Sequence, residues 1–217
     1  ADLLEQGEYI GVVDLADSNR QPLPKPDTRL GYLPLGVVGV FAASNFPLAF
    51  STAGGDTASA LAAGCPVVMK AHAAHPGTAE LVAQAISRAI ELCGIDTGVF
   101  SLIQGKNYAI ASQIVTHPQV KAVGFTGSFK GGTALFQLAN ARPEPIPVFA
   151  EMGSINPVVM LPQALAGSAE ALAQGFVGSL TMGTGQFCVN PGLVLALESE
   201  DLQQFIDATA ATLNDVA

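Results

Sequence analysis

Two residues carry side chains that could do covalent and acid–base chemistry from loops. Cys188 lies in an uncharged, glycine-rich stretch. A thiol there could act as a nucleophile if a neighbouring group lowers its pKa or takes its proton. Glu151 follows an apolar run, where burial would raise the pKa of its carboxyl toward a value suited to a general base. Each residue also has a simpler interpretation. Cys188 could be a small buried hydrophobic residue, and Glu151 could be a solvated carboxylate at a strand end.

Two further polar residues follow short apolar runs. Asn45 comes after the run at residues 37–41, and its amide could donate to a developing oxyanion. An Asn before Phe-Pro is equally typical of a turn. Lys70 closes the run at residues 66–69 and could bind a phosphate or a ribose hydroxyl. A lysine at a strand end often does no more than extend to solvent.

Residues 124–128, with the sequence Gly-Phe-Thr-Gly-Ser, join a predicted strand to a predicted helix. Their backbone N–H groups could face a phosphate. On the motif alone we favour a simple turn in which Ser128 caps the helix. The glycines at residues 183–185 come closest to a dinucleotide fingerprint, but they follow a helix instead of a strand, so we reject that interpretation.

The remaining cysteines and the histidines carry weaker signals. We expect Cys65 and Cys93 to be buried and structural. His72, His75 and His117 have no spacing that suggests a shared metal, so we predict that they are non-catalytic and that the chain holds no metal.

Short apolar runs alternate with helical patterns after residue 36. Strands are predicted at residues 37–41, 66–69, 99–103, 120–125 and 147–150, and helices at residues 52–63, 78–93, 108–116 and 130–139. Strands that are apolar on both faces predict a parallel sheet covered by helices on both sides. Ligands of such sheets bind beyond the carboxyl ends of the strands, so the loops that begin at Ala42, Lys70, Gly105, Thr126 and Glu151 are expected to form the site.

Irregular and α/β segments flank this pattern. The extended runs at residues 9–13 and 28–30 surround a proline-rich stretch and predict a hairpin or an extended arm. After Glu151, strands at residues 157–161 and 193–197 with a helix near residues 168–181 predict a second α/β unit.

Composition restricts the class of protein. Hydrophobic residues make up 49% and charged residues 12% of the chain, which indicates a deeply buried core. A net charge of -9 with 9 Lys and Arg argues against a nucleic-acid or anionic membrane surface. The longest uncharged stretches are broken by Gly, Pro, Asn and Gln, which is unlike a spanning helix. Three widely spaced cysteines and a start without a signal peptide favour a reducing, cytoplasmic setting, and the missing initial Met suggests a processed or truncated piece.

Six short motifs stand in the order found in the aldehyde dehydrogenase superfamily. They are residues 34–40, residues 45–48, the strand that ends in Lys70, residues 124–128, residues 151–153 and residues 185–188. The similarity runs from about residue 7 to the end and covers less than half of a full-length member. It implies a Rossmann-like parallel sheet of the α/β class with the start of an α/β catalytic domain. Residues 7–33 would be an oligomerisation hairpin, residues 34–150 most of the cofactor-binding domain, and residues 151–217 the N-terminal part of the catalytic domain.

The resemblance also implies roles for individual residues. Cys188 matches the nucleophile that forms a thiohemiacetal, with the Asn45 side chain and the Cys188 backbone N–H as the oxyanion hole. Hydride loss to NADP or NAD would leave a thioester, and Glu151 matches the base that activates water to hydrolyse it. The positions that match cofactor-binding residues are Lys70, Phe125, Thr126, Gly127 and Ser128.

Departures from the family pattern refine these expectations. Ala43-Ser44 stands where Pro-Trp is common, and Ser154 stands where the second Gly of Glu-Leu-Gly-Gly is usual. Ala73 stands where many NAD-preferring members have a Glu. Losing that carboxylate removes repulsion against a 2′-phosphate, so we predict that NADP is accepted. Residues 45–51 and 141–149 resemble the members that act on 2-oxoglutarate semialdehyde, which implies an acidic semialdehyde substrate.

Two alternatives stay open. A CoA-acylating relative would typically lack the hydrolytic carboxylate, so Glu151 argues against it. A non-catalytic fragment that only binds nucleotide or only oligomerises is a stronger rival, because later segments of the family are absent from the 217 residues. We expect these residues alone to be inactive, and the working protein to be a homo-oligomer.

Overall fold

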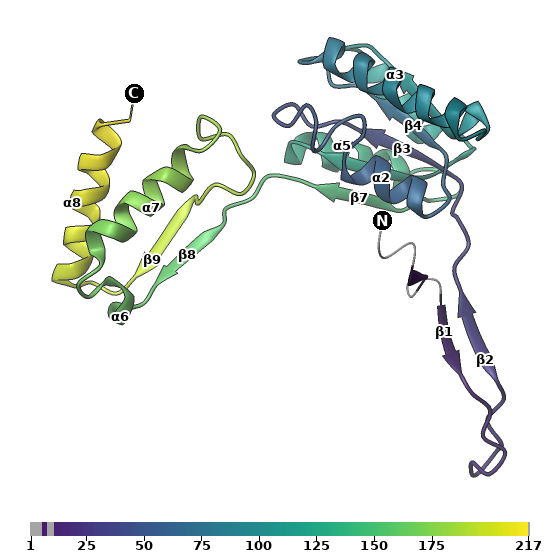
Figure 1. The fold of residues 1–217 in the computed structure, drawn as a ribbon, viewed down its shortest axis with the longest axis horizontal. Helices are drawn as coiled ribbons and strands as arrows, with labels where there is room; N and C mark the ends of the chain where they lie inside the picture. Colours follow the sequence, from purple (N-terminus) through teal and green to yellow (C-terminus); the bar gives the residue numbers. More distant parts are fainter. Residues whose placement is uncertain (1–5, 8–10, 217) are drawn as a thin grey trace. The chain divides into compact units, whose positions relative to one another are not determined.

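The computed structural model describes residues 6–7 and 11–216 and has the predicted α/β class. The chain divides into two compact units, Ala1–Glu151 and Met152–Ala217, and each unit has a parallel sheet of its own (Figure 1). None of the described helices combines the length and the apolar character needed to cross a membrane.

The first unit begins with the predicted hairpin. Strands β1 (Gly11–Asp14) and β2 (Thr28–Gly31) pair antiparallel, and Lys25 Nζ lies 2.6 Å from Asp14 Oδ1. Tyr9 and Ile10, which the sequence placed in the first run, lie outside the described residues. The exposed face of the hairpin includes Val12 and Leu30.

Five parallel strands among the described residues form the sheet of the first unit. In chain order they are β3 (Val37–Phe41), β4 (Val67–Lys70), β5 (Phe100–Ile103), β6 (Val120–Thr126) and β7 (Val148–Glu151). Their order across the sheet is β5-β4-β3-β6-β7. The chain therefore winds outward from β3 to β5 and returns to β6 on the other side of β3. The point between β3 and β6, where the winding reverses, is where ligands bind in sheets of this kind.

Helices cover both faces of this sheet, as predicted. Helices α2 (Gly55–Ala62) and α3 (Pro76–Leu92) bury Ala60, Ala83 and Ile90 in one core with Val40 and Met69. Helices α4 (Tyr108–Thr116) and α5 (Phe129–Asn140) form the other core, which contains Val115, Val123 and Leu135. A short 3-10 helix η1 (Thr97–Val99) precedes β5.

The helix ends differ from the predictions in physically simple ways. The helix predicted from residue 52 begins at Gly55, because the preceding residues form turns that bury Thr52. The helix predicted from residue 78 begins at Pro76, since proline fits the first helical turn, where its missing N–H costs nothing. Cys65 is buried as predicted, whereas the prediction for Cys93 is wrong: it caps the end of α3 and is exposed.

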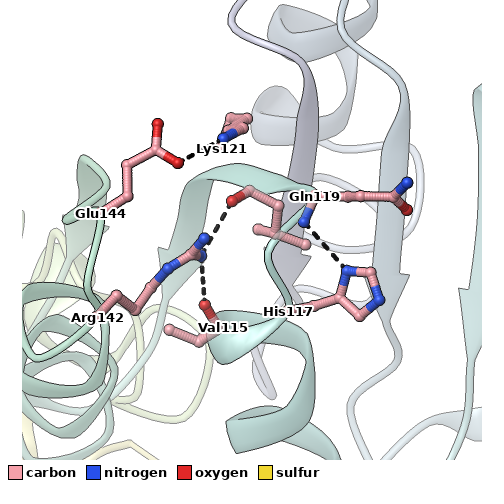
Figure 2. Close-up of polar contacts among 7 residues, drawn as sticks. Val115, His117, Gln119, Lys121, Arg142 and Glu144 are labelled. Atoms are coloured by element: carbon pink, nitrogen blue, oxygen red, sulfur yellow. Dashed lines mark hydrogen bonds and ion pairs between the residues drawn. The ribbon is translucent and has the colours of Figure 1, made fainter.

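A buried arginine joins the end of α4 to the start of β6 (Figure 2). Arg142 is 8% exposed, and its Nη1 donates to the carbonyl oxygens of Val115 at 2.7 Å and Val120 at 3.0 Å. The guanidinium thus links the last turn of α4 to the first residue of β6 by two charge-assisted hydrogen bonds. Beside it, the ion pair of Lys121 with Glu144, 2.8 Å between Nζ and Oε2, lowers the pKa of the Glu144 carboxyl.

The second unit is a smaller α/β layer. Strands β8 (Pro157–Met160) and β9 (Leu193–Ala196) pair parallel and are covered by α6 (Pro162–Leu165), α7 (Ala169–Thr181) and α8 (Glu200–Asn214). The core contains Leu165, Ala173 and Phe205. Helices α6 and α8 were not predicted. The predicted second α/β unit is present, with Val159 and Leu195 exposed on its strands.

Candidate functional site

A cavity of about 570 Å³ lies at the carboxyl ends of β3, β4 and β6 in the first unit. Part of its wall comes from residues at the starts of α4 and α5. All five residues that the sequence matched to cofactor binding line it: Lys70, Phe125, Thr126, Gly127 and Ser128. The structure therefore brings together residues that are more than fifty positions apart in the chain.

The turn from β6 into α5 is tightly packed. Ser128 caps α5, as predicted, and its Oγ accepts the Gly131 backbone N–H at 3.2 Å. A Cβ at Gly127 would lie 2.7 Å from the Phe125 ring, and one at Gly131 would lie 3.0 Å from it. Because only glycine fits under this ring, the backbone of the turn can line the cavity closely. The N-terminal end of α5, where helix N–H groups favour an anion, faces the same space.

The cavity presents cationic groups and hydrogen-bond donors. Lys70, His72 and Lys106 line it, and none of the described residues that line it is an Asp or a Glu. Burial lowers the pKa of Lys70. The pKa of His72 is lowered by burial first, and then by the nearby His75 and Lys70. The Ala74 N–H donates to His72 Nδ1 at 3.1 Å, so the neutral ring carries its proton on Nε2.

Several lining residues escaped the sequence analysis. Lys106, Asn107 and Tyr108 line the cavity, and Asn107 Oδ1 caps α4 by accepting the Ala109 N–H at 2.9 Å. The loop at Gly105 was expected to contribute, because it follows a strand. Nothing in the local sequence distinguished which of its side chains face the cavity.

Asn45 and Glu151 lie near the same edge of the sheet without lining the cavity. Asn45 is in an exposed bend after β3, four residues beyond Phe41. Glu151 ends β7, and its carbonyl oxygen accepts the Gly127 N–H at 3.0 Å. Of the two interpretations of Glu151, the structure shows the exposed carboxylate at a strand end, since β7 is the edge strand of the sheet.

A half-buried carboxylate is found instead at Asp56, a residue that the sequence did not single out. Asp56 lies in the first turn of α2 and is half-buried. Burial raises the pKa of its carboxyl most, the charge of Glu151 raises it further, and a hydrogen bond from Thr126 lowers it.

In the second unit, Cys188 is exposed on the loop between α7 and β9. Its thiol is accessible, which contradicts the plainer expectation of a small buried hydrophobe. Its carbonyl oxygen accepts hydrogen bonds from Ser154 Oγ and from Asn156 Nδ2, the latter at 2.7 Å. Both donors come from the segment before β8.

Two asparagines that precede prolines organise this loop. Asn156 also donates to the Asn190 carbonyl oxygen at 2.8 Å, and its φ of 48° is in the left-handed region. Asn190 Nδ2 donates to the carbonyl oxygens of Leu180 at 2.9 Å and Met182 at 3.0 Å. The two Asn-Pro pairs were a local sign of special backbone geometry that the sequence analysis did not use.

Comparisons with known proteins agree with one another. The model of the aldehyde dehydrogenase family matches residues 8–217. Alpha-ketoglutaric semialdehyde dehydrogenase 2 of Azospirillum brasilense is 58% identical over 214 residues, which are 98% of this chain and 41% of the relative. The alpha-ketoglutaric semialdehyde dehydrogenase of Acinetobacter baylyi is 53% identical over 98% of this chain and 40% of its own length.

A solved structure is similar in fold. The NAD-dependent benzaldehyde dehydrogenase from Corynebacterium glutamicum superposes with a TM-score of 0.75 at 26% identity, covering 97% of this chain and 43% of that one. The chain thus spans about 41% of the length of the first relative. Matched over nearly its whole length by the family model, the chain belongs to the aldehyde dehydrogenase family.

Proposed function

We propose that this chain carries the cofactor-binding domain and the nucleophile of an NAD(P)-dependent aldehyde dehydrogenase. The observation that carries the proposal is the cavity at the switch point of the sheet, with its cationic lining and two helix N-termini. The substrate we propose is an acidic semialdehyde such as 2-oxoglutarate semialdehyde, and the oxidation product is the carboxylic acid. The names of the relatives from A. brasilense and A. baylyi support this substrate class.

The residues of the cavity fit a nicotinamide dinucleotide. The start of α5, with Gly127 and Ser128, would hold the pyrophosphate, and Lys70 would hold the adenosine ribose. Ala73 also lines the cavity, and Lys106 adds a cation to it. This lining supports the acceptance of NADP as well as NAD, since no carboxylate among the described lining residues would repel a 2′-phosphate.

The chemistry follows from the groups of this chain. The Cys188 thiolate adds to the aldehyde carbon, and the Asn45 amide and the Cys188 N–H donate to the oxygen that becomes negative. A bound nicotinamide would supply the hydride acceptor for this oxidation, after which Cys188 would carry the acyl group as a thioester. Glu151 then takes a proton from water as the water oxygen adds to the thioester carbon. The C–S bond breaks, and the carboxylic acid and the thiolate are released.

The remaining parts of the proposal concern assembly. We assign residues 7–33 to an oligomerisation hairpin, residues 34–150 to the cofactor domain and residues 151–217 to the catalytic domain. The exposed Val12 and Leu30 of the hairpin support pairing with further copies of the protein. The three cysteines of the chain are free, which is consistent with a reducing cytoplasm.

The test uses the polypeptide as its source organism makes it, with 2-oxoglutarate semialdehyde and either cofactor. Cys188→Ala should abolish turnover while nucleotide binding persists. Glu151→Gln should give one round of hydride transfer per site and then stall. Turnover by Cys188→Ala would contradict the proposal. Nucleotide binding without any turnover by the wild type would favour the non-catalytic alternative.

A further inference from the structure

Asp56 is the half-buried carboxylate that the proposed reaction leaves unused. It occupies the first turn of α2, and it is the acidic residue of that helix. A carboxylate that is partly removed from water costs free energy unless it is hydrogen-bonded or paired with an opposite charge. The groups around it therefore decide what it does.

Strand geometry places Asp56 on the same face of the sheet as Glu151. Side chains alternate along a strand, so Gly124 and Thr126 project from the same face of β6. In the parallel register Thr126 is paired with Glu151 of β7, so these two side chains share that face. Helix α2 packs on it, because a Cβ at Gly124 would lie 3.2 Å from both Cβ and Cγ of Asp56.

Contacts of the carboxyl group agree with this placement. The Thr126 hydroxyl donates a hydrogen bond to the Asp56 carboxyl, and Thr126 is the register partner of Glu151. Gly124 has no side chain, and that absence leaves the space in which Asp56 lies. Burial and the Glu151 charge also raise the pKa of Asp56, so a proton is held there more readily than on an ordinary Asp.

We propose that Asp56 is a positioning residue that acts through Glu151, by accepting the proton that Glu151 takes from the hydrolytic water. This inference rests on the proposed function. When water adds to the thioester, one of its protons moves to the Glu151 carboxylate. That proton must leave before the next turnover. It passes to the Asp56 carboxylate and then to solvent, so each carboxyl group returns to its starting state.

The first experiment compares Asp56→Asn with the wild type in the polypeptide as its source makes it. Asn keeps the size of the side chain and an acceptor for Thr126, but it cannot take the proton. We expect kcat to fall about 10-fold, which is less than the roughly 100-fold or more of a direct general acid or base, because the exposed Glu151 can also lose its proton to solvent. The kcat/KM for the semialdehyde and the first-turnover burst of reduced cofactor should not change, since both depend only on steps that precede hydrolysis.

Two additions separate a proton-accepting role from a structural one. Added formate should restore part of kcat in Asp56→Asn, because a small carboxylate can take the proton, and Asp56→Glu should keep most of it. Asp96→Asn is the matched control, since Asp96 loses the same charge in the same unit while it caps η1 by accepting the Gly98 N–H. That variant should have normal kcat and no response to formate.

The outcomes are distinct. A wild-type kcat in Asp56→Asn, or a loss of kcat that formate does not reverse, overturns the role of Asp56. Asp56→Ser gives the same readout if Asp56→Asn does not fold. Failure of the proposed function looks different, because the wild type would then show no burst or Cys188→Ala would still turn over.

Discussion

The turn at the start of α5 and the loop that carries Cys188 are held in opposite ways. Ser128 Oγ accepts the backbone N–H of Gly131, three positions later, and Gly127 packs under the ring of Phe125, two positions earlier. The carbonyl of Cys188, in contrast, is held by Asn156, 32 positions earlier in the chain. The comparison teaches that the proposed cofactor side is organised by local sequence, whereas the nucleophile side depends on long-range side-chain hydrogen bonds.

Asn156→Ala should produce the largest effect if this contrast is right. The carbonyls of Cys188 and Asn190 lose a donor, and alanine is strained at a φ of 48°. We expect about 3 kcal/mol of lost stability, read from urea denaturation. Asn156→Gly is the control, because it loses the same hydrogen bonds without the backbone strain, and its loss should be about 1 kcal/mol smaller. Losses under about 0.5 kcal/mol in both variants would mean that Asn156 does not hold the loop.

Ala73→Glu tests whether a single residue of the cavity wall determines the preference between NADP and NAD. The new carboxylate would repel a 2′-phosphate, so the KM for NADP should rise about 10-fold, and that for NAD should stay or fall. Ala74→Glu places the same charge one position later, at an exposed residue that does not line the cavity. Equal changes for both cofactors, or the same change in Ala74→Glu, would show that Ala73 does not face the adenosine end of the cofactor.

Ser128→Ala and Ser199→Ala compare the same cap in the two units. Ser128 Oγ accepts the Gly131 N–H at 3.2 Å, and Ser199 Oγ accepts the Leu202 N–H at 3.1 Å. Each change should cost about 1 kcal/mol of stability by urea denaturation. Only Ser128→Ala should also raise the KM for the cofactor. An equal rise in Ser199→Ala would assign the effect to general destabilisation.

Of these variants, Asp56→Asn should change the stability least, and the size of the change should depend on pH. The pKa of Asp56 is raised in the folded state, so the folded protein holds the proton more tightly than the unfolded chain does. Stability due to this group is therefore present at acidic pH and is lost as pH rises through the raised pKa. At neutral pH the variant should melt a few °C higher at most, with no gain near pH 4. Thermal melts at both pH values check this, and a lower melting temperature at neutral pH would contradict it.

The sheet and its helices could be predicted from the sequence because the strands are short, β-branched and separated by regular helical patterns. Helix α8 could not, because its residues are mostly polar and Phe205 is the one that it buries among those described. Its packing on α7 depends on tertiary contacts, including the edge of the Phe205 ring against Phe176 at 5.8 Å between centroids.

The same division holds for the candidate site. Lys70 and residues 125–128 were found because each follows a strand, and parallel strands end at one edge. Asp56 has no local signal, since its position depends on a glycine 68 residues later and on the register of β6 with β7. Asn156 likewise acquires its partners only when β8 and β9 pair.

The buried Arg142 has a consequence for behaviour in salt. Its positive charge bonds to two carbonyl dipoles that the surrounding protein shields from mobile ions. Lys121 and Glu144 sit beside it with side chains 34% and 71% exposed, where dissolved ions screen their attraction. Raising the ionic strength should therefore weaken the ion pair between Lys121 and Glu144. The hydrogen bonds from Arg142 that join α4 to β6 should persist. The first unit thus places the salt-tolerant hydrogen bonds of Arg142 beside the salt-sensitive ion pair of Lys121 and Glu144.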